Sequence, residues 1–125
     1  MRYKFRAYNE NNEVMEYGVS VDNGRPVKEG YQLYNTENTV YHSQLMQFTG
    51  LTDVNGREIY EGDILDEYGY VVAFVDGTDS AALGMPMGWY EQRDDFESYR
   101  QLEVGDVKEV IGNIYQHKHL LKENE

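Results

Sequence analysis

The sequence contains no cysteine, which excludes disulfides, thiolate nucleophiles and cysteine-based zinc or iron–sulfur sites. It also lacks any run of about twenty apolar residues, the length that a membrane-spanning helix needs. Residues 1–8 alternate polar and apolar side chains instead of forming the apolar core of a signal peptide. These absences lead us to expect a cytoplasmic protein that makes no membrane contact.

Sequence motifs typical of enzymes are missing as well. Neither the GxGxxG fingerprint nor the GxxxxGK[ST] phosphate loop occurs in the chain. Ser43 and Ser80 lie in no nucleophile-elbow context, and His42 beside Ser43 is adjacency along the chain, not a catalytic triad. We therefore expect no enzymatic activity and no cofactor.

Basic residues are scarce, with 11 Lys and Arg against 23 Asp and Glu, so the formal net charge is −12. Such a charge repels phosphate backbones, and direct nucleic-acid binding is therefore disfavoured. Solubility is the simpler explanation of the acidity. An acidic DNA mimic that occupies a basic partner is the alternative.

Apolar and aromatic residues are abundant enough for a packed core, because hydrophobic residues make up 40% of the 125 positions and 12 of them are tyrosine. A chain of this length buries enough surface to fold as one domain without disulfides. We expect a single domain over residues 1–125, with residues 118–125 as a frayed polar tail.

Short alternating or β-branched runs, separated by Gly, Asn and Asp, predict about seven strands and no long helix. The runs fall near residues 3–7, 14–19, 31–34, 40–49, 59–65, 68–76, 89–90 and 107–115. Turns are expected at 53–56 and at the Gly62-Asp63 pair. Residues 94–102 suit a strand or a short helix, because Phe96, Tyr99 and Leu102 are three apart. The pattern predicts an all-β, small antiparallel barrel- or sandwich-like domain with at most short helices.

Three blocks of sequence resemble the YopX family of phage and prophage proteins. They are KFRAY at 4–8, LMQFTGL at 45–51 followed by NGREIYEGDI at 55–64, and EVIGNIY at 109–115. The resemblance implies a small β-rich product of a phage or prophage in a bacterial host cell, of unknown molecular function. It transfers no catalytic or binding residue. Glycines such as Gly56, Gly62 and Gly112 suit turns, bulges or close backbone approach, and they explain much of the shared pattern structurally.

The candidate interaction residues are Met85, Met87, Trp89 and Tyr90, which lie beside Gly84 and Gly88. Methionine and aromatic side chains are favoured in protein interfaces. The structural alternative is that they fill the core and close one end of a barrel. We expect a non-enzymatic accessory protein that acts through contacts with an unknown protein partner or with itself, as a homo-oligomer that uses exposed strand edges.

Other kinds of site have weaker support. A nucleic-acid-associated barrel would use Arg2, Lys4, Arg6 and Arg25 as a basic patch, with tyrosines stacking on unpaired bases. A metal-dependent hydrolase would centre on Glu61 and Asp63, within a carboxylate cluster that also holds Asp53, Glu58, Asp66 and Glu67. Its spacing matches no known metal loop. His117 and His119 form a His-x-His pair for which no third ligand is indicated, so we expect surface histidines and no metal site.

Overall fold

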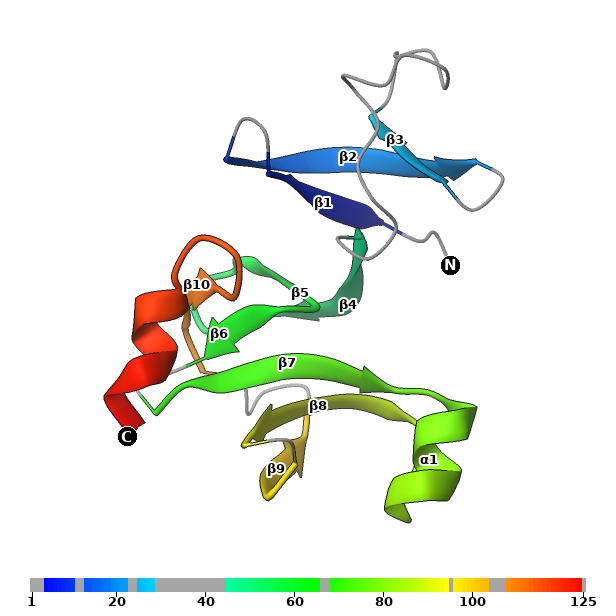
Figure 1. Cartoon of the computed structure of the whole chain (residues 1–125), viewed down its shortest axis with the longest axis vertical. Coiled ribbons are helices and arrows are strands. Elements are labelled where there is room, and N and C mark those ends of the chain that lie inside the picture. The colour runs from blue at the N-terminus through cyan, green and yellow to red at the C-terminus, as the bar shows by residue number, and fades with distance from the viewer. Residues whose placement is uncertain are drawn as a thin grey trace. The chain divides into compact units, whose positions relative to one another are not determined.

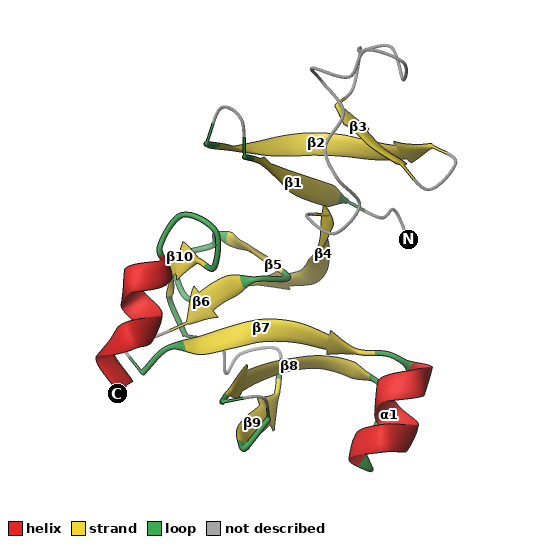
Figure 2. Ribbon diagram, in the orientation of Figure 1, coloured by secondary structure: helices red, strands yellow, loops and turns green. Residues whose placement is uncertain are grey.

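The structure is a computed structural model of the full chain, and it describes residues 4–10, 13–22, 25–28, 45–65, 68–94, 96–103 and 108–124. The chain divides into two compact units, Met1–Phe48 and Thr49–Glu125. Each unit is described by itself, and the expectation of a single domain stays a prediction. Within the described residues the elements are ten strands, one α-helix and one 3-10 helix (Figures 1 and 2). The expected all-β class with short helices is confirmed.

Two five-stranded sheets hold all of these strands, in the orders β3-β2-β1-β4-β5 and β10-β6-β7-β8-β9. The elements are β1 (Phe5–Asn9), β2 (Val14–Asp22), β3 (Arg25–Lys28), β4 (Leu45–Thr52), β5 (Glu58–Tyr60), β6 (Asp63–Leu65), β7 (Tyr70–Val75), α1 (Gly77–Leu83), β8 (Gly88–Arg93), β9 (Ser98–Gln101), β10 (Val110–Asn113) and the 3-10 helix η3 (Lys118–Asn124).

The first unit contains the hairpin expected from the N-terminal alternation. β1 pairs antiparallel with β2, and it also pairs with the first residues of β4. Alternation along β1 places Ala7 in a small core with Val19, against which Phe5 and Leu45 pack. The strand expected at residues 31–34 lies outside the described residues.

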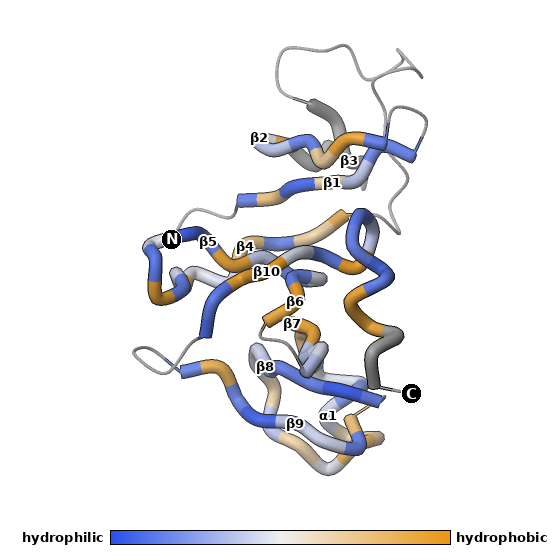
Figure 3. The backbone as a smooth tube through the Cα atoms, turned by 90° about the vertical axis from the view of Figure 1, so that its left-hand side faces the viewer, coloured by the Kyte–Doolittle hydropathy of each residue, from blue (hydrophilic) through white to orange (hydrophobic). Residues whose placement is uncertain are grey.

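The second unit buries apolar side chains on both faces of its sheet. Val72 of β7 packs with Ile59, Leu65 and Val110. Val75, three residues later and therefore on the other face, joins a second cluster with Met85 and Tyr90. The hydropathy colouring of Figure 3 shows the hydrophilic course of β9, whose four residues are all exposed. The β9 edge of this sheet is therefore exposed.

Both expected turns are present. The backbone N–H of Gly56 donates to the carbonyl of Asp53 at 3.0 Å, and Gly56 has a φ of 82°. Gly62 has a φ of 87° and donates its N–H to the carbonyl of Val72 at 2.9 Å before the chain enters β6. These positive φ angles explain why glycine occupies both positions.

Two local expectations differ from the structure. Residues 77–83, which follow the predicted strand at 68–76 and for which the sequence predicts no helix, form α1, which has no buried residue and hence no apolar period to reveal it. The helical alternative for 94–102 is wrong, because Asp94 and Phe96 adopt positive φ and Ser98–Gln101 pairs with β8 as β9. In the C-terminal segment, expected as a polar tail, the structure has η3.

Candidate functional site

The four candidate interaction residues divide into two groups. Met85 and Tyr90 are buried in the cluster with Val75, and the Tyr90 hydroxyl donates to the Pro86 carbonyl at 2.8 Å. Met87 is 58% exposed and Trp89 is half-buried. Only Met87 and Trp89 are therefore placed to meet a partner without rearrangement of the core.

An exposed residue that the sequence reasoning did not single out extends this surface. Phe74 of β7 lies directly opposite Trp89 of β8, and the ring centroids are 5.0 Å apart with the planes tilted by 60°. Phe74 is 41% exposed. We use the name β7–β8 apolar surface for the Phe74–Trp89 pair together with the exposed Met87, which immediately precedes β8. Strand alternation in β7 places Phe74 on the same face as Val72. The contact between Phe74 and Trp89 depends in addition on the register between β7 and β8, which the sequence does not reveal.

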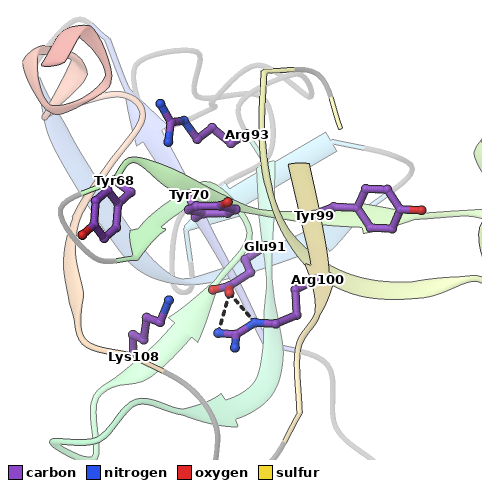
Figure 4. Close-up of a pocket in the computed structure, with 7 residues that line it drawn as sticks. All are labelled: Tyr68, Tyr70, Glu91, Arg93, Tyr99, Arg100 and Lys108. Atoms are coloured by element: carbon purple, nitrogen blue, oxygen red, sulfur yellow. Dashed lines mark hydrogen bonds and ion pairs between the residues drawn. The ribbon is translucent and has the colours of Figure 1, made fainter. Parts of the chain in front are cut away.

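A polar pocket of about 450 Å³ lies on the same sheet, and we call it the Glu91 pocket (Figure 4). Its lining comes from β7, β8, β9 and two adjoining loops. The residues are Tyr68, Tyr70, Glu91, Arg93, Tyr99, Arg100 and Lys108. None of them was predicted as a site residue from the sequence. The one local indication of a polar site is that Glu91 and Arg93 occupy alternate positions of a strand that begins Gly-Trp-Tyr.

The floor of the Glu91 pocket is an ion pair between neighbouring strands. Glu91 lies directly opposite Arg100, so both side chains share one face of the sheet. Oε1 of Glu91 accepts hydrogen bonds from Nε of Arg100 at 2.7 Å and from Nη2 at 2.6 Å. Glu91 is 2% exposed, and its Oε2 has no hydrogen-bond partner within the described part of the chain. One oxygen of this carboxylate is thus fully engaged and the other is not.

Aromatic and cationic groups surround this carboxylate. The Tyr70 hydroxyl and the Ser98 hydroxyl are hydrogen-bonded at 2.5 Å, and Nζ of Lys108 lies 5.9 Å from the centre of the Tyr70 ring. Figure 4 shows Glu91, Arg100 and Lys108 converging on one side of the Tyr70 ring. The Tyr99 ring points away from them and packs against Tyr90, with centroids 5.9 Å apart. Tyr99 thus lines the pocket while its ring contacts Tyr90.

Two of the carboxylates proposed for metal chemistry, Asp53 and Asp63, accept backbone hydrogen bonds that stabilise turns. Oδ2 of the buried Asp63 accepts the backbone N–H of Tyr60 at 2.8 Å, which fixes the turn between β5 and β6. Glu61 beside it is half-buried. Asp66 and Glu67 lie outside the described residues. Among the residues that are described, no group of three or more His, Asp or Glu is placed to hold a metal ion.

Asp53 is the most connected of these carboxylates. Its Oδ1 accepts the N–H groups of Asn55 at 2.8 Å and Arg57 at 2.9 Å, and its Oδ2 accepts the N–H of Val110 at 2.9 Å. Burial alone would raise the pKa of Asp53, but these backbone hydrogen bonds and the charge of Arg57 outweigh it and lower the pKa below its ordinary value. Asp53 thus joins the turn at 53–56 to β10.

The two C-terminal histidines lie near each other, with ring centroids 6.2 Å apart, but within the described ranges no third His, Asp or Glu joins them in a group that could hold a metal ion. Nδ1 of His117 accepts the backbone N–H of Asn113 at 3.0 Å, so that nitrogen is already used. The His117 ring packs over Gly112, where an added Cβ would lie 2.7 Å from Cγ of His117. The expected close backbone approach at Gly112 is therefore present. His42 lies outside the described residues.

The proposed basic patch is only partly described. Arg6 is buried, with its guanidinium 5.9 Å from the Tyr17 ring centre, and Nζ of Lys4 lies 5.1 Å from the centre of the Phe48 ring. Neither Arg2 nor the side chain of Arg25 is described. Arg6, being buried, is not available to an external phosphate. No helix in the described ranges is long and apolar enough to span a membrane.

Comparison with known proteins identifies the family of this chain. The family model described as YopX protein matches residues 4–122, which confirms the resemblance carried by the three sequence blocks. Among solved structures, the crystal structure of protein EF1440 from Enterococcus faecalis is similar, with 21% identity, 98% of this chain and 99% of that chain covered, and a TM-score of 0.49. A search of curated proteins gives no match.

Proposed function

This chain belongs to the YopX family, and from that premise we propose that it is a non-enzymatic accessory protein of a phage or prophage that acts by binding another protein. The observation that carries the proposal is the β7–β8 apolar surface, where Phe74, Met87 and Trp89 present aromatic and thioether groups to solvent. The proposed location is the cytoplasm of the bacterial host, which suits a chain without cysteine.

The residue types of this surface support a protein interface. Aromatic side chains and methionine are enriched where proteins meet, and tryptophan is a frequent hot-spot residue. Trp89 is also held in place, because it packs against the core of the second unit and its carbonyl accepts the N–H of Leu102 at 3.0 Å. A side chain that is already ordered loses little conformational entropy on binding.

Charge supports a particular kind of partner. With a net charge of −12, the chain attracts a basic protein and repels an acidic one over a distance of about 10 Å at moderate salt. A partner with an apolar centre and a basic rim fits both features. The DNA-mimic alternative relies on charge alone, so it predicts a complex that dissociates as salt rises, whereas contact through the apolar surface persists.

Self-association is the second form of the same proposal. β9 is at the edge of its sheet, and all four of its residues are exposed. An exposed edge strand offers unpaired backbone donors and acceptors to a strand of another copy. Light scattering of the purified chain separates the two forms, because a stable homo-oligomer forms without any added partner.

The direct test is affinity capture with variants of the apolar surface. Tagged wild-type chain, Met87→Glu and Phe74→Glu are exposed to lysate of a host that carries the parent element, with and without nuclease. Val54→Glu is the matched control, because Val54 is 70% exposed and gains the same charge outside the β7–β8 apolar surface. We expect one nuclease-resistant protein to be retained by wild type and Val54→Glu and reduced about tenfold or more with the other two variants. Equal capture by all four chains contradicts the proposal.

A further inference from the structure

Methionine is the side chain of this protein that reacts most readily with hydroperoxides, because the chain contains no cysteine. Of its five methionines, Met1 lies outside the described residues. Met15, Met46 and Met85 are buried, with exposed fractions of 9%, 3% and 4%, whereas Met87 is 58% exposed. Within the described part of the chain, the fold therefore leaves one methionine open to a peroxide in solvent.

The thioether of Met87 lies at the surface and not in the core. Its sulfur is 3.9 Å from the position that a Cβ on Gly77 would take, at the start of α1. Because α1 has no buried residue, this contact does not draw Met87 into the interior. Met85, two residues earlier, packs instead with Val75 and Tyr90. The chain thus contains two methionines that are close in sequence and opposite in accessibility.

Met87 belongs to the β7–β8 apolar surface, where a change of polarity has the largest effect on binding. The neighbouring Phe74 is 41% exposed, and its ring centroid is 5.0 Å from that of Trp89. Oxidation of a thioether to a sulfoxide places a strongly polar S–O group among such apolar side chains. Burial of that group in an interface without a donor is unfavourable, so contact through the surface is weakened.

From these observations we propose that Met87 is a modification site, at which a hydroperoxide converts the thioether to methionine sulfoxide and so weakens binding through the β7–β8 apolar surface. The selectivity for Met87 follows from burial of the other described methionines. The effect on binding rests on the proposed function, whereas the selectivity of the oxidation does not.

The reaction needs only the peroxide as oxidant. The sulfur lone pair of Met87 attacks the terminal oxygen of the hydroperoxide, and the S–O bond forms as the O–O bond breaks. The proton on the transferred oxygen moves to the leaving oxygen, which departs as water or an alcohol. Sulfur is oxidised by two electrons and the peroxide is reduced by two. Methionine sulfoxide reductases reverse this change, so the modification can be regulatory.

Treatment of the purified full chain with hydrogen peroxide tests the selectivity. Digestion and mass spectrometry at a series of times give the oxidation rate of each methionine. We expect Met87 to be oxidised at least about tenfold faster than Met15, Met46 and Met85. In concentrated urea the rates should converge, because unfolding removes the protection of the buried side chains. Oxidation of Met85 as fast as Met87 in the folded chain overturns the proposal.

Hydrophobic-interaction chromatography measures the change of the surface without any partner. Wild type oxidised at Met87 should elute earlier than the untreated chain, because its surface has become more polar. Met87→Leu keeps an apolar side chain without sulfur, so its elution should not change after the same treatment. Met85→Leu is the matched control, because this volume-conserving change removes a buried sulfur and leaves the shift intact. An equal shift in wild type and Met87→Leu contradicts the assignment to Met87.

Binding of the captured partner gives the functional readout. The partner retained by untreated wild type is eluted and presented to oxidised wild type, to oxidised Met87→Leu and to Met87→Gln, whose amide imitates the polarity of the sulfoxide. We expect retention to fall about tenfold with oxidised wild type and with Met87→Gln, and to persist with oxidised Met87→Leu. Full retention by oxidised wild type refutes this inference alone. Capture of no partner by untreated wild type refutes the proposed function and, with it, the effect of oxidation on binding.

Discussion

At the scale of single residues, buried carboxylates are the most informative groups in this chain. Asp53 and Asp63 accept backbone N–H groups at both ends of the segment from residue 53 to residue 63, and they hold its two turns in shape. Glu91 is equally buried but is satisfied through only one oxygen. Buried carboxylates therefore have different structural roles in this chain. Their roles differ with the number of backbone N–H groups that each carboxylate accepts.

Replacement of Asp53 by asparagine should reduce the free energy of unfolding by about 2 kcal/mol. The substitution replaces one acceptor oxygen with an NH₂ group, which cannot accept a hydrogen bond and would face a backbone N–H. The lowered pKa of Asp53 makes this cost depend on pH. The folded pKa lies below the unfolded value of 3.8, so the stabilisation is present above that value and is lost as pH falls through the folded pKa.

Urea unfolding at a series of pH values measures this effect. The difference between wild type and Asp53→Asn should be full at about pH 6 and should shrink toward about pH 2, because asparagine does not titrate. A difference that stays constant across this range would show that the charge of Asp53 does not contribute.

At the scale of elements, α1 shows how local chemistry can form a helix without help from the core. Asp76 precedes the helix in an extended conformation, and its Oδ1 accepts the N–H of Asp79 at 2.8 Å. Gly84 follows the helix with a φ of 71° and donates its N–H to the carbonyl of Ser80. A seven-residue helix with no buried residue depends on such caps more than a packed helix does.

Loss of the N-cap should therefore be measurable. We expect Asp76→Ala to reduce the free energy of unfolding by about 1 kcal/mol, while Asp76→Asn, which keeps an acceptor oxygen, loses about half of that or less. Chemical denaturation of both variants checks the prediction. Equal losses for alanine and asparagine would assign the effect to charge near the helix terminus instead of the cap.

At the scale of the whole molecule, the excess of acidic residues is the dominant electrostatic property. Like charges repel one another in the compact state, and salt screens this repulsion. Within the described residues, two of the basic side chains that line the Glu91 pocket have acidic partners, because Arg100 pairs with Glu91 and Arg93 lies 3.7 Å from Asp94.

Salt should stabilise the protein. Between about 20 mM and about 300 mM sodium chloride we expect the melting temperature to rise by about 3 °C, as screening reduces the repulsion. Lys4→Glu makes the net charge more negative and should show a larger rise. A melting temperature that falls with salt would mean that favourable ion pairs outweigh the net repulsion.

The sequence by itself determined the family, the all-β class and the turns at 53–56 and 62–63, because glycine at positive φ and alternating strands leave local signals. Only the tertiary structure decided which surfaces are available. Strand register places Trp89 opposite Phe74 and Glu91 opposite Arg100. Tyr90, which lies between Trp89 and Glu91 along the chain, is buried. The Glu91 pocket joins residues from 68 to 108, and no local pattern records such a meeting, since it depends on which strands pair and in which register.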